Sequence, residues 1–202
     1  MPQQLTYNMD EHTSDRTPSP EDNLLGIIDS NIINEYEAKG IANAELFVFQ
    51  LDTEISITAG LILDINRIAF GELYEWAGKW RTVPVAVGQL DPPLPHQIPH
   101  LIYQFTDNLN FKISVSATKE SHLECLVYTH YEYIRIHPFN NGNGRTGRIL
   151  MNLVAMKFGY KPLKLYHREG NSRKIYIEAM QQADKGNYIP LTRLMNDELV
   201  VF

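Results

Sequence analysis

Apolar residues recur at helical spacing along nearly all of the chain from Leu24 onward, and this limits the possible folds more than any other feature. The clearest stretch predicts a helix over residues 119–136. A second predicted helix covers residues 144–158 and ends at Gly159, with Pro162 three residues later, as is typical of helix C-termini. The apolar faces of these two helices consist of Leu123, Leu126, Val127, Tyr131 and Ile134, and of Ile149, Leu150, Leu153 and Val154. We therefore expect an all-α helical bundle in which two amphipathic helices flank a glycine-rich segment.

Weaker helical patterns fill most of the remaining chain. Separate helices are indicated around Leu25–Tyr36, Ala44–Ile55, Leu61–Leu73, Ile98–Leu109, Ile175–Ala183 and Leu191–Leu199. The first 22 residues are polar and rich in proline, so they are interpreted as an N-terminal arm, either loose or laid across the domain. Residues 23–202 are assigned to a single domain with its helical core at about 43–200.

One segment departs from the helical pattern. In Thr82–Gly88, three valines alternate with the period of a strand, and Pro84 predicts that this strand lies at a sheet edge because proline donates no ladder hydrogen bond. We interpret Arg81–Pro95 as a protruding β-hairpin, and this range is called the flap below.

Composition excludes several classes of protein. Hydrophobic residues make up 44% of the 202 residues, which is enough for a sizeable core, and the formal net charge of −6 argues against a nucleic-acid binder or an anionic-membrane binder. Cys125 is the only cysteine, so an internal disulfide and a cysteine-based zinc site are excluded. With no apolar signal core at the N-terminus and no membrane-spanning run, a cytoplasmic protein is expected.

The segment His137–Arg148, called the motif segment below, has the features of an anion site. Gly142 and Gly144 permit close backbone approach just before a predicted helix N-terminus, where N–H groups and the helix dipole favour negative charge. Asn143 adds an amide donor, and Arg145 and Arg148 lie three residues apart on one helix face with forked donors that suit phosphate oxygens. Such a group of donors suits a polyphosphate.

His137 immediately precedes this anion site. An imidazole at that position could accept a proton from a hydroxyl group that attacks a bound phosphate. The alternative is a histidine that only caps the preceding helix. For Phe139 a structural role in the core is preferred.

These residues resemble the motif HPFx(D/E)GNGRxxR of the Fic family. His137, Pro138 and Phe139 match, as do Gly142, Asn143, Gly144, Arg145 and Arg148. The stretch Leu73–Arg81 and the valine strand after it are also similar to the family, so that the resemblance covers about residues 43–200. It implies the all-α Fic fold with its flap.

The resemblance also implies a function, since most Fic proteins transfer AMP from ATP to a Ser, Thr or Tyr hydroxyl of a target protein and release pyrophosphate. By position, His137 would be the general base, and Gly142, Asn143 and Gly144 would hold the α- and β-phosphates. Arg145 would stabilise the phosphates, and Arg148 would hold the γ-phosphate.

Further roles follow from the same resemblance. The flap residues Val85, Ala86, Val87 and Gly88 would cover the nucleotide and hold the target by strand pairing. Tyr176 and Asp184 would line the adenosine pocket, although Tyr176 could equally belong to the core and Asp184 to the surface.

The chain departs from the family at the acidic position that usually ligates Mg²⁺, which is Asn141 here. A neutral amide oxygen lacks the charge that hard cations favour. Three interpretations follow: a slower AMP-transferase, an altered nucleotide or metal preference, or a nucleotide-binding interaction module with little catalysis. Transfer of UMP or of a γ-phosphoryl group is a further alternative, and removal of AMP from a target is a weaker one.

Many family members are inhibited by a glutamate within a [S/T]xxxE[G/N] helix. The nearest match places Glu21 in that role, but the prolines at positions 18 and 20 make a continuous helix awkward. The alternatives are an acidic arm without this role and a separate antitoxin-like partner.

Overall fold

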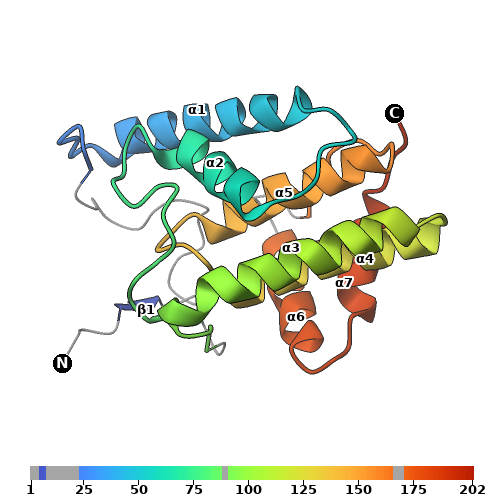
Figure 1. Ribbon diagram of the computed structural model, residues 1–202. Helices are drawn as coiled ribbons and strands as arrows, with labels where there is room; N and C mark the ends of the chain where they lie inside the picture. Colours follow the sequence, from blue (N-terminus) through green and yellow to red (C-terminus); the bar gives the residue numbers. More distant parts are fainter. Residues whose placement is uncertain (1–4, 8–22, 88–90, 166–170) are drawn as a thin grey trace.

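The computed structural model describes residues 5–7, 23–87, 91–165 and 171–202, and within these ranges the chain is mostly helical (Figure 1). The all-α prediction is therefore confirmed. The helices are α1 (Ser30–Phe49), α2 (Ala59–Phe70), α3 (Ile98–Val115), α4 (Lys119–Ile136), α5 (Asn143–Lys157), α6 (Ser172–Ala183) and α7 (Ile189–Asp197), with a short 3₁₀ turn η1 (Pro95–Gln97) before α3. Two short strands, β1 (Leu5–Tyr7) and β2 (Val85–Val87), complete the described elements.

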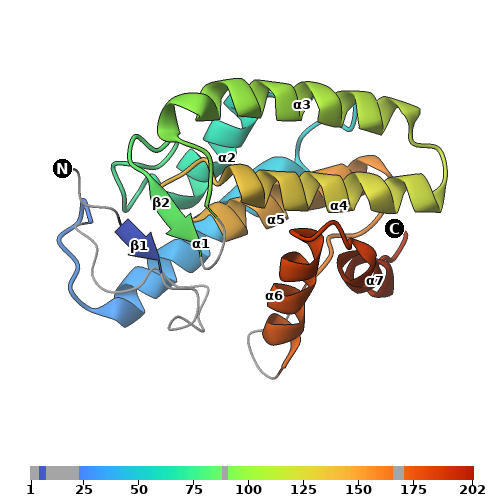
Figure 2. The ribbon, with the colours of Figure 1, turned by 90° about the horizontal axis from the view of Figure 1, so that it is seen from below.

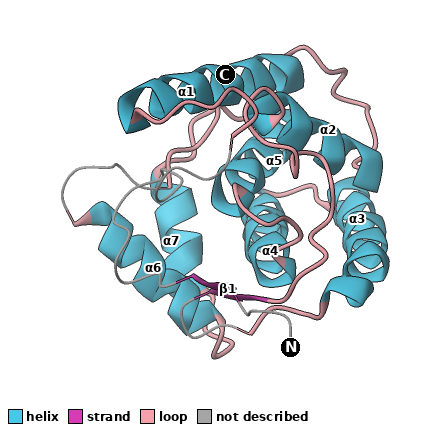
Figure 3. Cartoon of the chain, turned by 90° about the vertical axis from the view of Figure 1, so that its left-hand side faces the viewer, coloured by secondary structure: helices cyan, strands magenta, loops and turns pink. Residues whose placement is uncertain are grey.

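The core is built around α5. This helix contacts α1, α2 and α4, and Figure 3 shows it among these three helices. Its inward face is completely buried at Leu150, Val154 and Ala155. The apolar stripe that the sequence predicted therefore forms the centre of the fold, and α6 and α7 pack under α4 in Figure 1.

The predicted pair of helices before residue 56 is wrong, because α1 is one continuous helix from Ser30 to Phe49. Asp29 caps its start by accepting a hydrogen bond from the Asn31 N–H, which leaves the preceding apolar residues outside the helix. Gly40 lies in the middle of α1 without breaking it. A Cβ at this glycine would come within 2.0 Å of the Ala69 carbonyl oxygen, so Gly40 allows α1 and α2 to cross closely.

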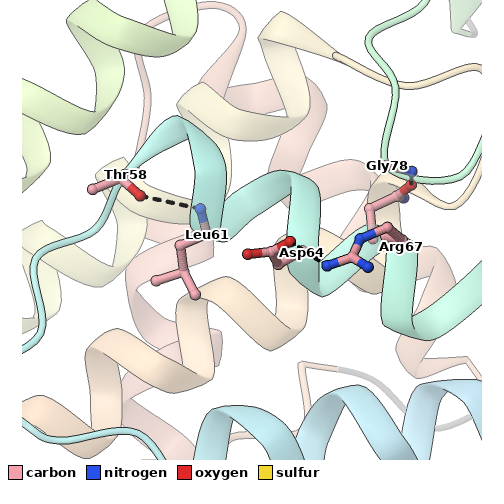
Figure 4. A network of polar contacts seen from close by, with 6 residues as sticks. Thr58, Leu61, Asp64, Arg67 and Gly78 are labelled. Atoms are coloured by element: carbon pink, nitrogen blue, oxygen red, sulfur yellow. Dashed lines mark hydrogen bonds and ion pairs between the residues drawn. The ribbon is translucent and has the colours of Figure 1, made fainter.

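Helix α2 positions the turn that leads to the flap. Its N-cap Thr58 accepts a hydrogen bond from the Leu61 N–H at 3.1 Å, and Asp64 pairs with Arg67 at 2.6 Å (Figure 4). The stem of Arg67 packs against Gly78, which has φ of +71° and where a Cβ would lie 2.7 Å from the Arg67 Cβ. The turn after α2 is therefore fitted closely to the helix surface.

The flap is not a hairpin in its described part. Strand β2 pairs in parallel with β1 from the N-terminal arm, in the register Leu5↔Val85, Thr6↔Ala86 and Tyr7↔Val87, and Figure 2 shows the two strands side by side. Residues 91–94 form no strand. Pro92 and Pro93 lack the N–H groups that a returning strand would donate, which accounts for the absence of a strand in residues 91–94.

Within the described ranges, no helix combines the length and apolarity that a membrane span requires.

Candidate active site

His137 caps the C-terminus of α4 in a left-handed conformation, with φ of 48° and ψ of 61°. Its Nδ1 lies 3.3 Å from the Ile134 carbonyl oxygen, which can only accept a hydrogen bond, so Nδ1 carries the proton and Nε2 keeps its lone pair. Burial, with a smaller contribution from the Arg81 charge, lowers the pKa of His137 to about 4. The imidazole is therefore neutral near pH 7 and able to accept a proton at Nε2.

The motif segment is held in shape by its own asparagine. Asn143 is 2% exposed, accepts a hydrogen bond from the Phe139 N–H at 2.9 Å and donates one to the Phe139 carbonyl at 2.8 Å. Phe139 is fully buried and packs against Trp80 with ring centroids 5.1 Å apart, in agreement with the structural role preferred for it. The Asn143 side chain thus stabilises the loop, and what it presents toward an anion is its backbone N–H at the start of α5.

The N-terminus of α5 follows directly from Gly142. This residue has φ of +75°, and a Cβ there would lie 2.4 Å from a ring carbon of Phe70, so both conformation and space require glycine. Its N-cap is Gly142, which has no side chain to accept a hydrogen bond from the first turn. The first N–H groups of an α-helix lack intrahelical acceptors, and together with the helix dipole they favour an anion at this point.

Arg145 does not extend along the anion site with Arg148. Its guanidinium pairs with Glu37 of α1 at 2.7 Å, and Glu37 also accepts a hydrogen bond from the Tyr74 hydroxyl at 2.9 Å. Glu37 is 3% exposed, and Arg145 lies over the Phe70 ring at 4.5 Å. The structure thus places the first motif arginine in a buried ion pair that joins α1 to α5.

Arg148 remains at the start of α5. One of its terminal nitrogens is 3.4 Å from the position that a Cβ on Gly144 would occupy, so its guanidinium folds back over the first turn of α5. Its charge also reaches His130 of α4, where burial first and this arginine second lower the pKa to about 3. Arg148 therefore adds positive charge where the helix dipole already favours an anion.

Tyr176 and Asp184 both contact α4. The Tyr176 hydroxyl is 2.8 Å from Nε2 of His130, and the Tyr131 hydroxyl donates to Asp184 at 3.2 Å. The contact between His130 and Tyr176 thus joins α4 to α6.

Asn141, the predicted metal ligand, accepts a hydrogen bond from the Gly142 N–H at 2.7 Å. Among the described residues there is no group of three or more His, Cys, Asp or Glu side chains that could hold a metal ion. The described part of the chain thus offers a neutral oxygen but no carboxylate cluster, so Mg²⁺ would depend largely on the phosphates of a bound nucleotide for its ligands.

The flap contributes strand β2. Val85 and Val87 are buried and Ala86 is partly exposed, in keeping with the alternation seen in the sequence. Two predicted residues, Gly88 in the flap and Glu21 in the arm, lie outside the described residues.

Sequence reasoning missed three buried polar residues around the site. Glu37 pairs with Arg145, Asn66 donates to Thr146 at 3.1 Å and accepts from the Gly78 N–H at 2.8 Å, and Arg81 is buried beside His137. The only hint of a role for Glu37 in the sequence is that an acidic residue stands among the apolar residues of α1. Asn66 and Arg81 have partners far away in the sequence, which periodicity does not detect.

The chain is similar to known proteins of one family. Residues 56–155 match the model of the Fic/DOC family. Two curated relatives are named Protein adenylyltransferase Fic: one from Nematostella vectensis is 29% identical over 85% of this chain and 39% of its own length, and one from Drosophila willistoni is 31% identical over 84% and 34%. The chain thus spans between a third and two fifths of the length of these relatives.

Solved structures share the fold. Fic-1 (residues 134–508) from C. elegans has a TM-score of 0.72 at 26% identity and covers 87% of this chain and 52% of its own. BepC from Bartonella tribocorum, described as having bound AMPPNP, has a TM-score of 0.71 at 21% identity, with coverage of 92% and 94%. At that identity the second likeness concerns the fold alone.

Proposed function

Because this chain belongs to the Fic/DOC family, we propose that it is a protein adenylyltransferase, which transfers AMP from ATP to a Ser, Thr or Tyr hydroxyl of a target protein. The observation that supports this most directly is local. A neutral imidazole with its Nε2 lone pair available stands a few residues before a helix N-terminus whose N-cap is a glycine. The curated relatives that bear the name of this activity provide the second support.

The proposed reaction is an in-line displacement at the α-phosphorus. The target oxygen forms a bond to this phosphorus while its proton passes to Nε2 of His137, and the bond from the phosphorus to the pyrophosphate oxygen breaks. His137 suits this step because its Nδ1–H is directed to the Ile134 carbonyl, which fixes the ring and the tautomer. Most of the remaining catalysis would come from positioning and from stabilising the negative charge that spreads over the phosphates.

The phosphates would be held at the start of α5. The backbone at Gly142, Asn143 and Gly144 supplies N–H donors, and Arg148 supplies the nearby positive charge. We assign Arg145 a role other than the phosphate contact that its sequence position suggested. We assign it to holding the loop against α1 through Glu37, because a buried ion pair keeps its guanidinium directed there.

The base and sugar of ATP would lie beside α6, where Tyr176 and Asp184 contact α4. ATP itself is supported by the adenylyltransferase relatives. Magnesium would enter with the nucleotide, and Asn141 would contribute a neutral amide oxygen that weakens metal binding without removing it.

The target would dock at the flap by pairing with β2, whose backbone is suited to strand addition. In the structure one edge of β2 pairs with β1 of the arm, so a target either replaces β1 or adds to the other edge. Inhibition by Glu21 or by an antitoxin-like partner, and a cytoplasmic location, remain predictions from the sequence.

A labelling experiment tests the proposal. Purified protein is incubated with a native lysate and with ATP labelled at either the α- or the γ-phosphate. We expect α-label to enter protein and γ-label to stay in pyrophosphate, with incorporation by His137→Ala reduced by about 100-fold or more. Incorporated γ-label would instead indicate phosphoryl transfer, and equal labelling by wild type and His137→Ala would refute the assigned base.

A second candidate is a nucleotide-binding interaction module with little catalysis, favoured by Asn141 at the usual acidic position. This candidate predicts that ATP binds, as measured by calorimetry, while no label is transferred even after prolonged incubation. Binding of ATP together with transfer that requires His137 would exclude it.

A further inference from the structure

Arg81 is a buried arginine at the base of the flap. It is 2% exposed and is among the largest fully buried side chains of the described structure. Its Nε donates to the His137 carbonyl at 2.8 Å, one terminal nitrogen donates to the Val83 carbonyl at 3.1 Å, and the other donates to the Pro93 carbonyl. Its backbone N–H donates to the Pro138 carbonyl at 2.9 Å.

These bonds connect three places that are distant in the sequence. Val83 precedes strand β2 and Pro93 follows it, so the two terminal nitrogens hold the two ends of the flap together. The Nε–H and the backbone N–H reach the motif segment. A single side chain therefore sets where the flap stands relative to His137.

The chemistry of Arg81 is unusual for a residue with only a packing role. Among the described residues its side chain bonds to carbonyl oxygens and pairs with no carboxylate, and burying a cation in this way is unfavourable. Burial lowers the pKa of Arg81 accordingly. The planar guanidinium donates from three different nitrogens to three separate carbonyls, a spread that the single ammonium nitrogen of lysine does not reproduce.

The bond to His137 falls on a residue whose backbone is strained. Within the described ranges His137 is the only non-glycine residue with positive φ. Its N–H bonds to the Tyr133 carbonyl, and its own carbonyl receives the Arg81 Nε–H. Arg81 thus stabilises the left-handed conformation in which His137 ends α4.

We infer that Arg81 is a positioning residue that holds the flap and His137 in one fixed relation, so that a target strand on β2 meets the imidazole. The part of this inference that concerns a target strand rests on the proposed function, whereas the link that Arg81 makes between the flap and His137 does not. Arg81 touches none of the phosphate-holding groups at the start of α5, and the flap would only cover a nucleotide that those groups already hold. Loss of Arg81 should therefore weaken target use much more than ATP binding.

The first test follows amide hydrogen exchange in the full chain and requires neither ATP nor target. In Arg81→Lys, exchange in residues 82–87 and 91–94 should accelerate by about tenfold or more, while α5 keeps its wild-type protection. Arg67→Gln serves as the control, because Arg67 is an exposed arginine on the neighbouring α2 that pairs with Asp64. Unchanged exchange in the flap, or an equal acceleration in α5, would overturn the inference.

The second test measures kinetics with the target found by labelling. We expect Arg81→Lys to raise the target KM by about tenfold while the ATP dissociation constant stays within about twofold of wild type. An equal weakening of both would indicate a merely structural role. If wild type transfers no label, the proposed function fails, and hydrogen exchange still decides whether Arg81 holds the flap.

A measurement on the wild-type protein tests the inference even if Arg81→Lys does not fold. The Arg81 Nε–H resonance, observed by ¹⁵N NMR, should exchange slowly with water because it is buried and bonded to the His137 carbonyl. Exchange as fast as that of an exposed arginine would contradict the inference.

Discussion

The motif segment and the flap meet at the same site, but they are held in opposite ways. The motif segment lies between two long helices, and its polar groups bond to buried partners: Asn143 to Phe139, and Arg145 to Glu37. The described part of the flap has one three-residue strand, and its links to the body run through Arg81 and β1. Phosphate binding and proton transfer need fixed geometry, whereas a surface that accepts a peptide strand benefits from weaker attachment.

Changes at the motif segment should lower the unfolding free energy of the whole domain, whereas changes at the flap should have little effect on it. The largest effect is expected for Glu37→Gln. This variant leaves the Arg145 guanidinium buried without its carboxylate, and we expect a loss of about 3–5 kcal/mol of unfolding free energy, measured by urea denaturation.

Glu72→Gln is the matched control for this prediction, because Glu72 pairs with Lys39 on the surface. Its expected loss is below about 1 kcal/mol. Equal losses for the two variants would show that the Glu37 pair contributes no more than a surface pair.

Gly142→Ala should have the next largest effect. The new methyl group meets the Phe70 ring, and φ of +75° strains any residue with a Cβ, so a loss of about 3 kcal/mol is expected together with weaker ATP binding. Gly159→Ala separates the two causes, because Gly159 also has positive φ (+82°) but no neighbour within 4 Å. We expect about 1 kcal/mol there, and similar losses at both positions would argue against the contact with Phe70.

Acidic pH should lower the stability of the protein through two buried histidines at and near the motif segment. The pKa of His130 is lowered to about 3 and that of His137 to about 4 by burial, below the ordinary 6.5 that applies to the unfolded chain. The unfolded state thus binds these protons first, and stability should be complete above about pH 6.5 and fall as the pH decreases toward 4.

The variant His130→Asn should show a smaller decrease over this pH range, measured as the midpoint of urea unfolding. A wild-type midpoint that is constant from pH 7 to pH 4 would disprove the assignment of neutral buried histidines.

The smallest effect on stability is expected at the flap. Deletion of residues 1–7 removes β1 and should cost less than about 1 kcal/mol, because a two-stranded sheet of this length contributes little. The same deletion opens the edge of β2 and should raise the rate of target labelling. Deletion of residues 1–4, which keeps β1, is the control, and a loss of stability comparable to that of Glu37→Gln would erase the difference between the two regions.

Helices and motif were predictable for a local reason. The period of 3.6 residues and the glycine at position 159 located α4 and α5 almost to the residue, because a helix that buries one face repeats apolar residues on every turn. The two helices predicted before residue 56 are replaced by the single helix α1, and Gly40 within it becomes a contact surface only because α2 lies against it.

The roles of individual polar residues were less accessible. The sequence placed Arg145 and Arg148 on one helix face with a shared task, and the fold separates them by bringing Glu37 to one of the two. His130 gained a partner on α6, and β2 gained a parallel partner from the arm in place of a hairpin. Each outcome depends on a segment more than 40 residues away.

By itself, the order of residues determined that this chain is an all-α domain with a glycine-rich turn, a histidine before it and arginines after it. Such features depend on backbone freedom, helical period and side-chain type, which act over a few neighbouring residues. Only the tertiary structure decided which charges are neutralised, which imidazole nitrogen keeps its lone pair, and that Arg81 links the flap to the motif segment. Those properties arise from burial and from hydrogen bonds between distant segments, and they exist only after the helices have packed.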